Sequence, residues 1–467
     1  MKVINLDTPT LGDRSYIAHD SKFAVVVDPQ RDIDRVIEIV ESEGVQIVAV
    51  VETHMHNDYV SGGLVLAREF GAKYLVNEAD PVAFDRNAIK DLEVVEFGDF
   101  AIQAIHTPGH TYTHLSYALL DNSEKALGIF TGGSMLHGST GRPDLLGQAH
   151  ANELAGLQYK SAHRLADMFE GEVRIHPTHG FGSFCAATAT SGDSSTIADE
   201  KIANPVLLLS QNEYVEQTLA GLDAFPSYYK HMGPANHAGP GPVDIGNLAR
   251  LTGEELVKHI NAGVWIVDLR NRNEYVNSHL AKTLNFGLDG SMATYFGWMF
   301  DYEQNVILSA PTDAMVTEAH RELVRIGIDK PLGAFVGDIT AVDPQVSMKQ
   351  VLFKDVVQGL KDENVVVLDV RRSGERVASH IKGTLHIPLH ELESRVEELP
   401  TDKDIWIHCA GAYRASASLG IVERSGRKAV LINEAFDAAH SVAELEFVEG
   451  AADHAPVAPS DLTLEKS

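Results

Sequence analysis

Short apolar runs alternate with amphipathic segments through the first half of the chain. Valine-rich and β-branched runs predict buried strands, and residues 33–44 and 64–71 carry the helical spacing of apolar positions. Gly44 is placed to end the first of these helices. The predicted strands cover residues 23–28, 47–52, 73–77, 92–106, 116–120, 126–130 and 172–176. Many strands with helices between them predict an α/β domain in which two sheets lie between layers of helices.

The second half repeats itself after a Pro and Gly cluster at 233–243. The segment that begins at Val267, VDLRNRNEYVNSHL, returns at Leu368 as LDVRRSGERVASHI. Four identities keep one offset of 101 residues (369 − 268): Asp268 with Asp369, Arg270 with Arg371, Glu274 with Glu375, and His279 with His380. A repeat of this length indicates a duplicated domain rather than a solenoid. We therefore expect domains at 1–240, 246–340 and 346–450, followed by a loose tail at 451–467.

Composition narrows the class of protein. The 467 residues are 44% hydrophobic and 22% charged, which is typical of a soluble globular protein, and the formal charge of −28 makes nucleic acid and anionic membranes poor partners. The N-terminus lacks a signal-peptide pattern, so we expect a cytoplasmic protein. Two cysteines, Cys185 and Cys409, exclude a disulfide framework. The sequence is compatible with a homo-oligomer.

Metal-binding side chains follow the ends of several predicted strands. His54, His56 and Asp58 come directly after the strand at 47–52, and in an extended segment their side chains leave the backbone on one side. His110 follows a Pro-Gly turn after another strand, and His179 follows a fourth. Ligands in α/β proteins gather at such strand ends. The spacing therefore predicts a metal site rather than a pair of surface histidines.

Together these segments resemble the metallo-β-lactamase fold, an αββα sandwich, and within it the persulfide dioxygenase branch, over residues 1–240. The resemblance implies a single Fe(II) held by His54, by His110 and by an aspartate whose position is occupied here by Gly133. His56, Asp58 and His179 are additional candidate ligands or supporting groups that could re-form the site. Zinc is an alternative metal for this site, and the sequence does not determine whether the site holds a metal.

Three further residues carry open alternatives. A dinuclear zinc thioester hydrolase of the same fold would need a histidine at the position of Tyr59 and a bridging aspartate at the position of Gly133. This sequence therefore lacks two ligands of the zinc enzyme but one ligand of the iron enzyme, which makes the zinc enzyme the weaker alternative. Arg142 matches a Gly-Arg-x-Asp segment and either binds substrate or pairs with Asp144. Cys185 is either a sulfur relay or a packed thiol.

The segment DIWIHCAGAYRASASLG, with Cys409 at a strand end and Arg414 five residues later, resembles the rhodanese active site. Small residues let backbone N–H groups curve around the cysteine in front of a helix N-terminus, which favours an anionic persulfide sulfur. Arg414 adds charge for thiosulfate or sulfite. Aligned by the repeat, the middle domain offers Leu308 or Ser309 at the position of Cys409, so we expect an inactive copy.

The whole arrangement resembles the bacterial persulfide dioxygenase-sulfurtransferase fusions of sulfide detoxification, a metallo-β-lactamase αββα sandwich followed by two rhodanese-like α/β domains. That resemblance implies oxidation of a small persulfide or polysulfide to sulfite, which then takes the outer sulfur of a Cys409 persulfide and leaves as thiosulfate. Two alternatives remain. One is a sulfurtransferase whose first domain is a degenerate, oxygenase-inactive module, and the other is the zinc thioester hydrolase.

Overall fold

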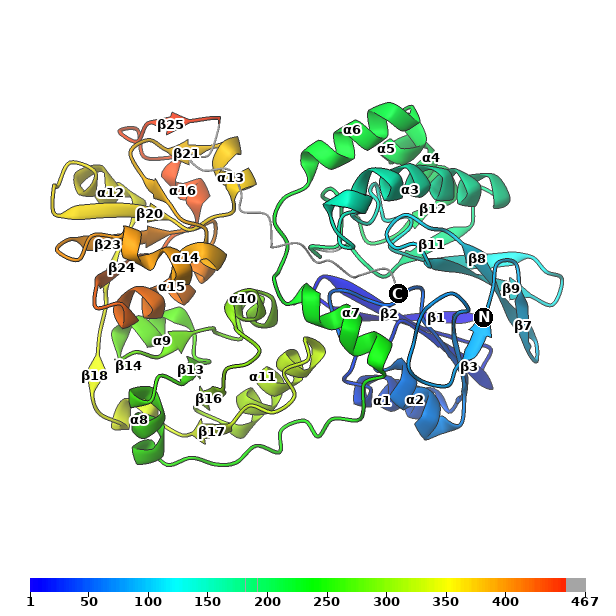
Figure 1. Ribbon diagram of the computed structural model, residues 1–467, viewed down its shortest axis with the longest axis horizontal. Coiled ribbons are helices and arrows are strands. Elements are labelled where there is room, and N and C mark those ends of the chain that lie inside the picture. Colours follow the sequence, from blue (N-terminus) through cyan, green and yellow to red (C-terminus); the bar gives the residue numbers. More distant parts are fainter. Residues whose placement is uncertain (181, 191, 451–467) are drawn as a thin grey trace. The chain divides into compact units, whose positions relative to one another are not determined.

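The computed structural model describes residues 1–180, 182–190 and 192–450, and the predicted tail at 451–467 lies outside them. The chain forms two compact units (Figure 1). The first holds Met1–Val243 with Val324–Gly327, and the second holds Asp244–Leu323 and continues from Ile328.

Two six-stranded sheets form the centre of the first unit. The first sheet has the order β1 (Lys2–Thr8), β2 (Asp13–His19), β3 (Phe23–Val27), β4 (Gln46–Val51), β5 (Lys73–Asn77), β6 (Asn87–Ile89). The second has the order β12 (Ser195–Thr196), β11 (Arg174–Pro177), β10 (Ala126–Gly132), β9 (Leu115–Asp121), β8 (Phe100–His106), β7 (Val94–Phe97). The predicted strands are confirmed. The N-terminal pair β1 and β2 adds to the first sheet two strands that the sequence patterns did not indicate.

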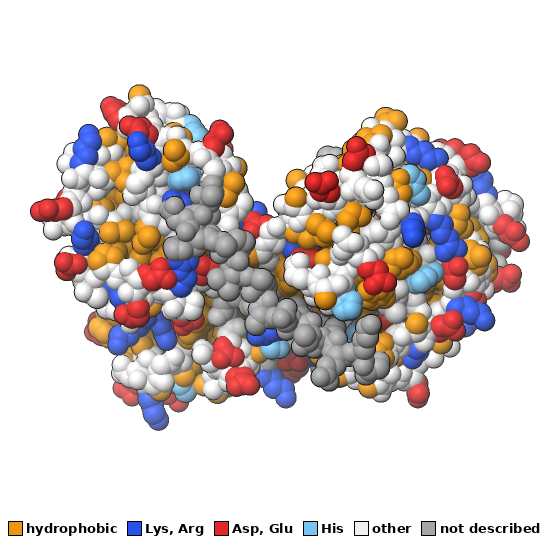
Figure 2. All heavy atoms as spheres, turned by 45° about the horizontal axis from the view of Figure 1, so that its top comes forward, with side chains coloured by type: hydrophobic (Ala, Val, Ile, Leu, Met, Phe, Trp, Pro, Cys, Tyr) orange, Lys and Arg blue, Asp and Glu red, His pale blue; other side chains and the backbone are white. Residues whose placement is uncertain are grey.

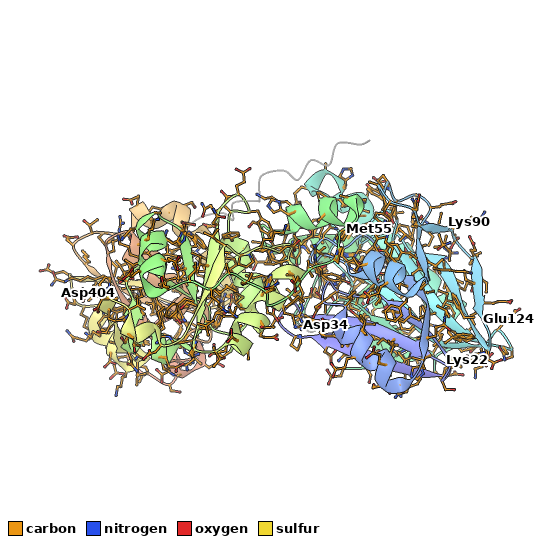
Figure 3. All side chains as sticks on the ribbon, turned by 90° about the horizontal axis from the view of Figure 1, so that it is seen from below. Lys22, Asp34, Met55, Lys90, Glu124 and Asp404 are labelled. Carbon is orange, nitrogen blue, oxygen red and sulfur yellow. The ribbon has the colours of Figure 1, made fainter. Side chains whose placement is uncertain are left out.

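Three apolar layers hold this unit together. Buried residues of both sheets, among them Val25, Leu75 and Phe130, pack between the sheets. Helices α1 (Asp34–Glu43) and α2 (Gly63–Phe70) cover the outer face of the first sheet, and the buried side chain of Met55, labelled in Figure 3, belongs to that layer. The second sheet is covered by α3 (Gln148–Met168), α5 (Pro205–Leu208) and α6 (Gln211–Gly221), flanked by α4 (Ile197–Ala203). Helix α7 (Tyr229–Ala238) is the last helix of the unit. The layers of helices and sheets form the predicted αββα sandwich.

The second unit contains two parallel sheets of matching strand order. The first runs β15 (Leu284–Asn285), β13 (Trp265–Asp268), β16 (Val306–Ala310), β17 (Gly333–Val336). The second runs β22 (Leu385–His386), β20 (Val365–Asp369), β23 (Asp404–His408), β24 (Lys428–Ile432), β19 (Lys349–Val351). Two short pairs complete the strands, β14 (His279–Leu280) with β18 (Gln345–Val346) and β21 (His380–Ile381) with β25 (Phe447–Val448).

Helices flank both sheets. The first sheet is accompanied by α8 (Gly253–Asn261), α9 (Arg272–Asn277), α10 (Met292–Met299) and α11 (Asp313–Arg325), with the short 3-10 turn η1 (Ile339–Ala341). The second is accompanied by α12 (Phe353–Gly359), α13 (Ser373–Ala378), α14 (Leu389–Arg395), α15 (Tyr413–Arg424) and α16 (Phe436–Ala439), with η2 (Val396–Glu398).

The sequence repeat has the same structure in both copies. Arg270 pairs with Asp268 and donates to a carbonyl eight residues on at 2.9 Å, and Arg371 makes the same two contacts around Asp369. Buried arginine and aspartate at equal positions therefore brace the same strand-to-helix connection twice.

Strand register corrects the alignment of the middle copy. Asp268 lies opposite Ser309 and Asp369 lies opposite His408, so the residue that corresponds to Cys409 is Ala310. The predictions of Leu308 or Ser309 are wrong because the middle copy has two more residues between its paired strands than the last copy has. The chemical conclusion is unchanged, since alanine carries no thiol.

The two copies share a close interface within the second unit. Helix α15 lies against β15, where a Cβ added at Gly420 would stand 2.3 Å from the Thr283 carbonyl oxygen. The hydroxyl of Ser416 donates to Asn285 at 2.6 Å, and that of Tyr413 donates to the Gly287 carbonyl at 2.9 Å. The helix that follows Cys409 is therefore fixed partly by the other copy.

Charged side chains of both signs are scattered over the visible surface of each unit (Figure 2). None of the helices in residues 1–180, 182–190 and 192–450 combines the length and hydrophobicity that a bilayer crossing requires.

Candidate functional site

Three fully buried histidines meet in the first unit. His54 follows β4, His110 follows β8, and His179 follows β11. Their ring centroids are 4.8, 5.1 and 5.2 Å apart, which makes a nearly equilateral triangle. Ligand nitrogens from all three lie within 4.8 Å of one another. The strand ends therefore bring together two predicted ligands and one predicted additional ligand.

Hydrogen bonds orient these rings. The Nδ1 of His110 donates to the Arg142 carbonyl at 2.9 Å, which leaves Nε2 as a buried acceptor with no partner among the described residues. The Nδ1 of His54 lies 2.9 Å from the Thr53 hydroxyl, which itself donates to Asp28, so His54 donates and its Nε2 also carries a lone pair. A divalent ion fits between such nitrogens.

His179 connects the triangle to two buried carboxylates. Its Nδ1 lies 3.0 Å from Asp13 and 3.2 Å from Asp58, while its Nε2 faces the Nε2 of His54 at 3.3 Å. Burial opposes the charged ring, but the Asp58 charge and hydrogen bonds to both carboxylates raise the pKa of His179 to about 10. Burial lowers the pKa of His110 to about 3, and burial with the charge of His56 lowers that of His54 well below its usual range.

His56 lies beside His54, with ring centroids 4.1 Å apart, as expected for side chains on one side of the segment. Its own ring nitrogens nevertheless turn to a different set of partners. The Nε2 of His56 lies 3.3 Å from Asp28 and 3.4 Å from Glu52, with the Tyr59 hydroxyl at 3.0 Å. Although burial favours the neutral ring, the Asp28 charge raises the pKa of His56 to about 9. His56 thus serves a buried ion cluster, and its Nδ1 stays 4.0 Å from Asp58.

Gly133, the position of the missing carboxylate, has no room for a side chain. A Cβ there would stand 2.3 Å from Cδ2 and 2.6 Å from Cγ of His110. The backbone N–H of Gly133 donates to Nε2 of His114 at 3.0 Å, and Nδ1 of His114 meets the Thr107 hydroxyl at 2.9 Å. The family's aspartate therefore does not fit beside His110 as it lies here.

Sequence reasoning missed His114 and Asp13. His114 lies four residues after His110 and could have been found by that spacing, but its nitrogens are both used to hold the loop. Asp13 opens β2, far from any recognised motif, and no local pattern indicated it.

Arg142 and Cys185 are both held by neighbours. The Arg142 guanidinium makes two bonds to Asp144, at 2.7 and 2.8 Å, and also donates to the carbonyls of Phe184 and Asp223. This geometry favours the pairing alternative, and a substrate contact stays a prediction. The Cys185 thiol is buried, lies 3.7 Å from the Tyr229 hydroxyl, and has a pKa raised well above its usual value by burial.

Cys409 opens the turn between β23 and α15 in the second unit. Its thiol is 1% exposed and accepts a hydrogen bond from the Ala415 backbone N–H, in the first turn of α15, at 3.4 Å. Ala412, just before the helix, has φ +65°, a left-handed conformation that turns the chain around the sulfur. One backbone N–H of the helix N-terminus therefore lies at the sulfur, and a cradle of several N–H groups stays a prediction.

Arg414 lies beside this turn but is not isolated. It makes two short bonds to Glu375, at 2.6 and 2.7 Å. Burial would raise the pKa of Glu375, yet the hydrogen bonds and charge of Arg414 lower it to about 2. Glu375 was seen in the sequence only as a repeated residue, because its partner lies 39 residues away.

The middle copy supplies one wall of a pocket beside Arg414. Tyr295, Trp298 and Met299 of α10 face residues of the last copy across it. The Trp298 ring stacks on His390 with centroids 4.5 Å apart, and Arg414 lies 5.8 Å from the Tyr295 centroid. The space between these side chains is only about 10 Å³, so the two copies pack closely beside Arg414.

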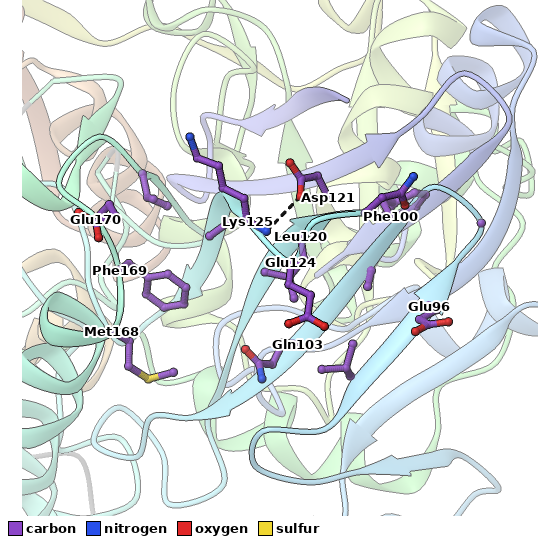
Figure 4. A pocket seen from close by; sticks show the side chains of 16 residues that line it. Glu96, Phe100, Gln103, Leu120, Asp121, Glu124, Lys125, Met168, Phe169 and Glu170 are labelled. Carbon is purple, nitrogen blue, oxygen red and sulfur yellow. Dashed lines mark hydrogen bonds between the residues drawn. The ribbon is translucent and has the colours of Figure 1, made fainter.

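Another hollow in the first unit lies on β7 to β10 and the end of α3 (Figure 4). Its charged groups include Glu96, Glu124, Lys125 and Glu170, and it contains no histidine or cysteine. It is separate from both candidate sites.

Two segments of the chain match known protein families. Residues 11–124 match the metallo-beta-lactamase superfamily, and residues 352–441 match the rhodanese-like domain. The human mitochondrial persulfide dioxygenase ETHE1 (Homo sapiens) is 30% identical over 211 residues, which are 45% of this chain and 74% of that protein. A hydroxyacylglutathione hydrolase of Francisella philomiragia is 26% identical over 173 residues, 37% of this chain and 64% of that protein.

Among solved structures, a metallo-beta-lactamase from Staphylococcus aureus aligns with a TM-score of 0.64 at 24% identity. The alignment covers 72% of this chain and 98% of that one, more than the first unit alone provides. The likeness shows a shared fold that continues into the second unit.

Proposed function

Because the chain belongs to the family of the persulfide dioxygenase ETHE1 and also carries a rhodanese-like domain, we propose that it couples two reactions. The first unit oxidises a low-molecular-weight persulfide to sulfite, and the second transfers sulfur through Cys409 to give thiosulfate. The first reaction balances as RSSH + O2 + H2O giving RSH, sulfite (SO3²⁻) and two protons. The second balances as Cys-S-S⁻ + sulfite giving Cys-S⁻ and thiosulfate.

The observation that carries the sulfur-transfer half is the Cys409 thiol at the N-terminus of α15, with the Ala415 N–H at 3.4 Å. Attack of the thiolate on a persulfide forms a new S–S bond and releases the donor thiol. The outer sulfur of the resulting Cys409 persulfide is anionic, and backbone N–H groups with Arg414 stabilise it. Sulfite then attacks this outer sulfur, and the Cys409 thiolate leaves.

In the first unit we propose that His54 and His110 hold a single Fe(II), with Nε2 of each ring turned to the ion. The ion supplies the position at which dioxygen and persulfide meet and react. The buried rings exclude bulk water, and the hydrogen bonds of Thr53 and the Arg142 carbonyl fix which nitrogen of each ring is available. Carrying both active sites on one chain raises the effective concentration of sulfite at Cys409.

A direct test uses Cys409→Ser, with Cys185→Ser as the matched control because that second thiol is also buried. We expect thiocyanate production from thiosulfate and cyanide to fall to background in Cys409→Ser and to persist in Cys185→Ser. Unchanged production in Cys409→Ser would end the proposal for the second unit. Oxygen uptake on glutathione persulfide by the iron-loaded chain tests the first unit.

A second candidate function is favoured by Gly133. The missing carboxylate is consistent with a sulfurtransferase whose first unit has lost oxygenase activity, and iron-loaded protein that consumes no oxygen would support it. The zinc thioester hydrolase is less well supported, because Tyr59 occupies the position of a zinc-binding histidine and its hydroxyl contacts His56 and the Asp28 carbonyl instead.

A further inference from the structure

The buried histidine triangle offers three nitrogen ligands where the family pattern offers two nitrogens and a carboxylate. We infer that His179 is the third protein ligand of the metal in the first unit, which makes the centre a three-histidine site for a divalent transition metal. The inference deepens the proposed function, since it names the ligand set of the ion with which the persulfide would react.

The spacing of the nitrogens fits one ion. Ligand bonds of about 2.0 to 2.1 Å at octahedral or tetrahedral angles place neighbouring nitrogens roughly 2.8 to 3.4 Å apart. Nε2 of His54 and Nε2 of His179 are 3.3 Å apart. Nε2 of His110 is a buried acceptor without a partner among the described residues, and it belongs to the same group. Without an ion this contact is a hydrogen bond that shares one proton between the two nitrogens, and a divalent ion bound there would take the place of that proton.

The family's third ligand, an aspartate at position 133, has no room in this structure. With His110 in place, the Cβ of any residue at Gly133 would overlap the His110 ring. A Cβ at Gly141 would likewise stand 2.6 Å from Nδ1 of His110. The ring is therefore held between two glycine backbones and faces His54 and His179, not a carboxylate from the β10 end.

The two other clusters of possible ligands are less suited to an ion. Both oxygens of Asp28 already accept bonds from Thr53, and one also accepts from Thr178, while His56 lies between Asp28 and Glu52 as their counter-charge. In the cluster of His56, Asp58 and His179, the nitrogen that His179 turns to Asp58 is Nδ1, which also meets Asp13. Nε2 of His179 stays available for the triangle.

Two carboxylates lie behind the His179 ring, so negative charge is kept near the metal site although no carboxylate binds the ion directly. Asp13 accepts from Nδ1 of His179 at 3.0 Å, and Asp58 lies at 3.2 Å on the same side. A carboxylate behind a ligating histidine fixes its orientation and makes it a stronger ligand. Asp13 and Asp58 thus compensate for the negative charge that an aspartate at position 133 would have contributed directly. In this arrangement Asp13 is a positioning residue.

The test measures metal binding rather than turnover. Anaerobic Co²⁺ titration of the full chain, followed by visible absorption, should give one tight site per chain. His179→Ala should weaken it by more than the roughly 10- to 100-fold typical of a lost supporting carboxylate, and Asp13→Asn should fall within that range. His176→Gln is the matched control, because His176 lies on β11 and outside the triangle, and it should bind like the parent. Binding by His179→Ala as tight as by His176→Gln would overturn the inference.

A second readout counts the imidazoles and does not depend on affinity. Electron spin echo spectra of the Cu²⁺-loaded chain should show three coordinated imidazoles in the parent and two in His179→Gln. Two in the parent would overturn the inference, even if His179→Ala fails to fold. Failure of the proposed function would look different from failure of this inference. A site with three imidazoles but no oxygen uptake would refute the oxygenase function and keep the ligand set. Oxygen uptake by a chain in which His179 does not bind the metal would keep the function and refute the ligand set.

Discussion

Replacing Gly133 with aspartate restores the family's ligand type, yet we expect it to weaken the metal site. A Cβ at this position would stand 2.3 Å from Cδ2 of His110, and ordinary contact begins at 3.4 Å. The His110 ring or the Gly133 backbone must therefore move by about 1 Å, in a buried site without slack. Overpacking of this kind costs about 1 to 3 kcal/mol.

Two measurements follow from that displacement. The melting temperature of the first unit should fall by about 2 to 4 °C per kcal/mol lost, and Co²⁺ affinity should drop because His110 is pushed from the triangle. Gly133→Ala is the matched control, because it adds the same Cβ without a carboxylate and should lose both stability and affinity. Tighter Co²⁺ binding in Gly133→Asp than in the parent, together with weaker binding in Gly133→Ala, would refute the reasoning, because the new carboxylate would then be a ligand.

Three further predictions concern the second unit. Glu375→Gln should remove a stabilising contribution on the order of 3 kcal/mol, because the pKa of Glu375 in the folded chain lies below its ordinary value. This contribution is present above pH 4.5 and is lost as the pH falls toward 2. Denaturant unfolding curves of the parent and the variant should therefore differ at pH 6 and converge at pH 3. Glu375→Gln should also raise KM for thiosulfate, since Arg414 loses the partner that orients it. Trp298→Ala should lower the melting temperature of the second unit, because the ring is buried and its stacking on His390 alone contributes about 0.5 to 1.5 kcal/mol; an unchanged melting temperature would show that α10 does not brace the last copy. Gly420→Ala should destabilise the second unit by about 1 to 3 kcal/mol, because its Cβ meets a carbonyl of the other copy. Gly411→Ala, in the same unit but with open space, should not destabilise it, and equal melting temperatures of the two variants would show that the interface yields.

Local patterns predicted many of the elements, though not β1 and β2, and they pointed to most of the candidate chemical groups. Alternating apolar runs predicted the strands of the sandwich because burial on a sheet face imposes a period that is visible in the sequence. Cys409 and Arg414 were found because a strand end, a short turn and a helix start follow one another along the chain. His54 and His110 were found in the same way, each directly after its own strand.

The tertiary structure decided which of these groups meet. His54 and His179 are 125 residues apart, and only the meeting of strand ends from both sheets brings their nitrogens to 3.3 Å. Local spacing placed His56 beside His54, where it lies, but only the tertiary structure shows that its Nε2 meets Asp28 and Glu52. The contact of Glu375 with Arg414 and the packing of α10 beside Arg414 were equally hidden, because ion pairing and interface packing act through space, and a sequence records only neighbours along the chain.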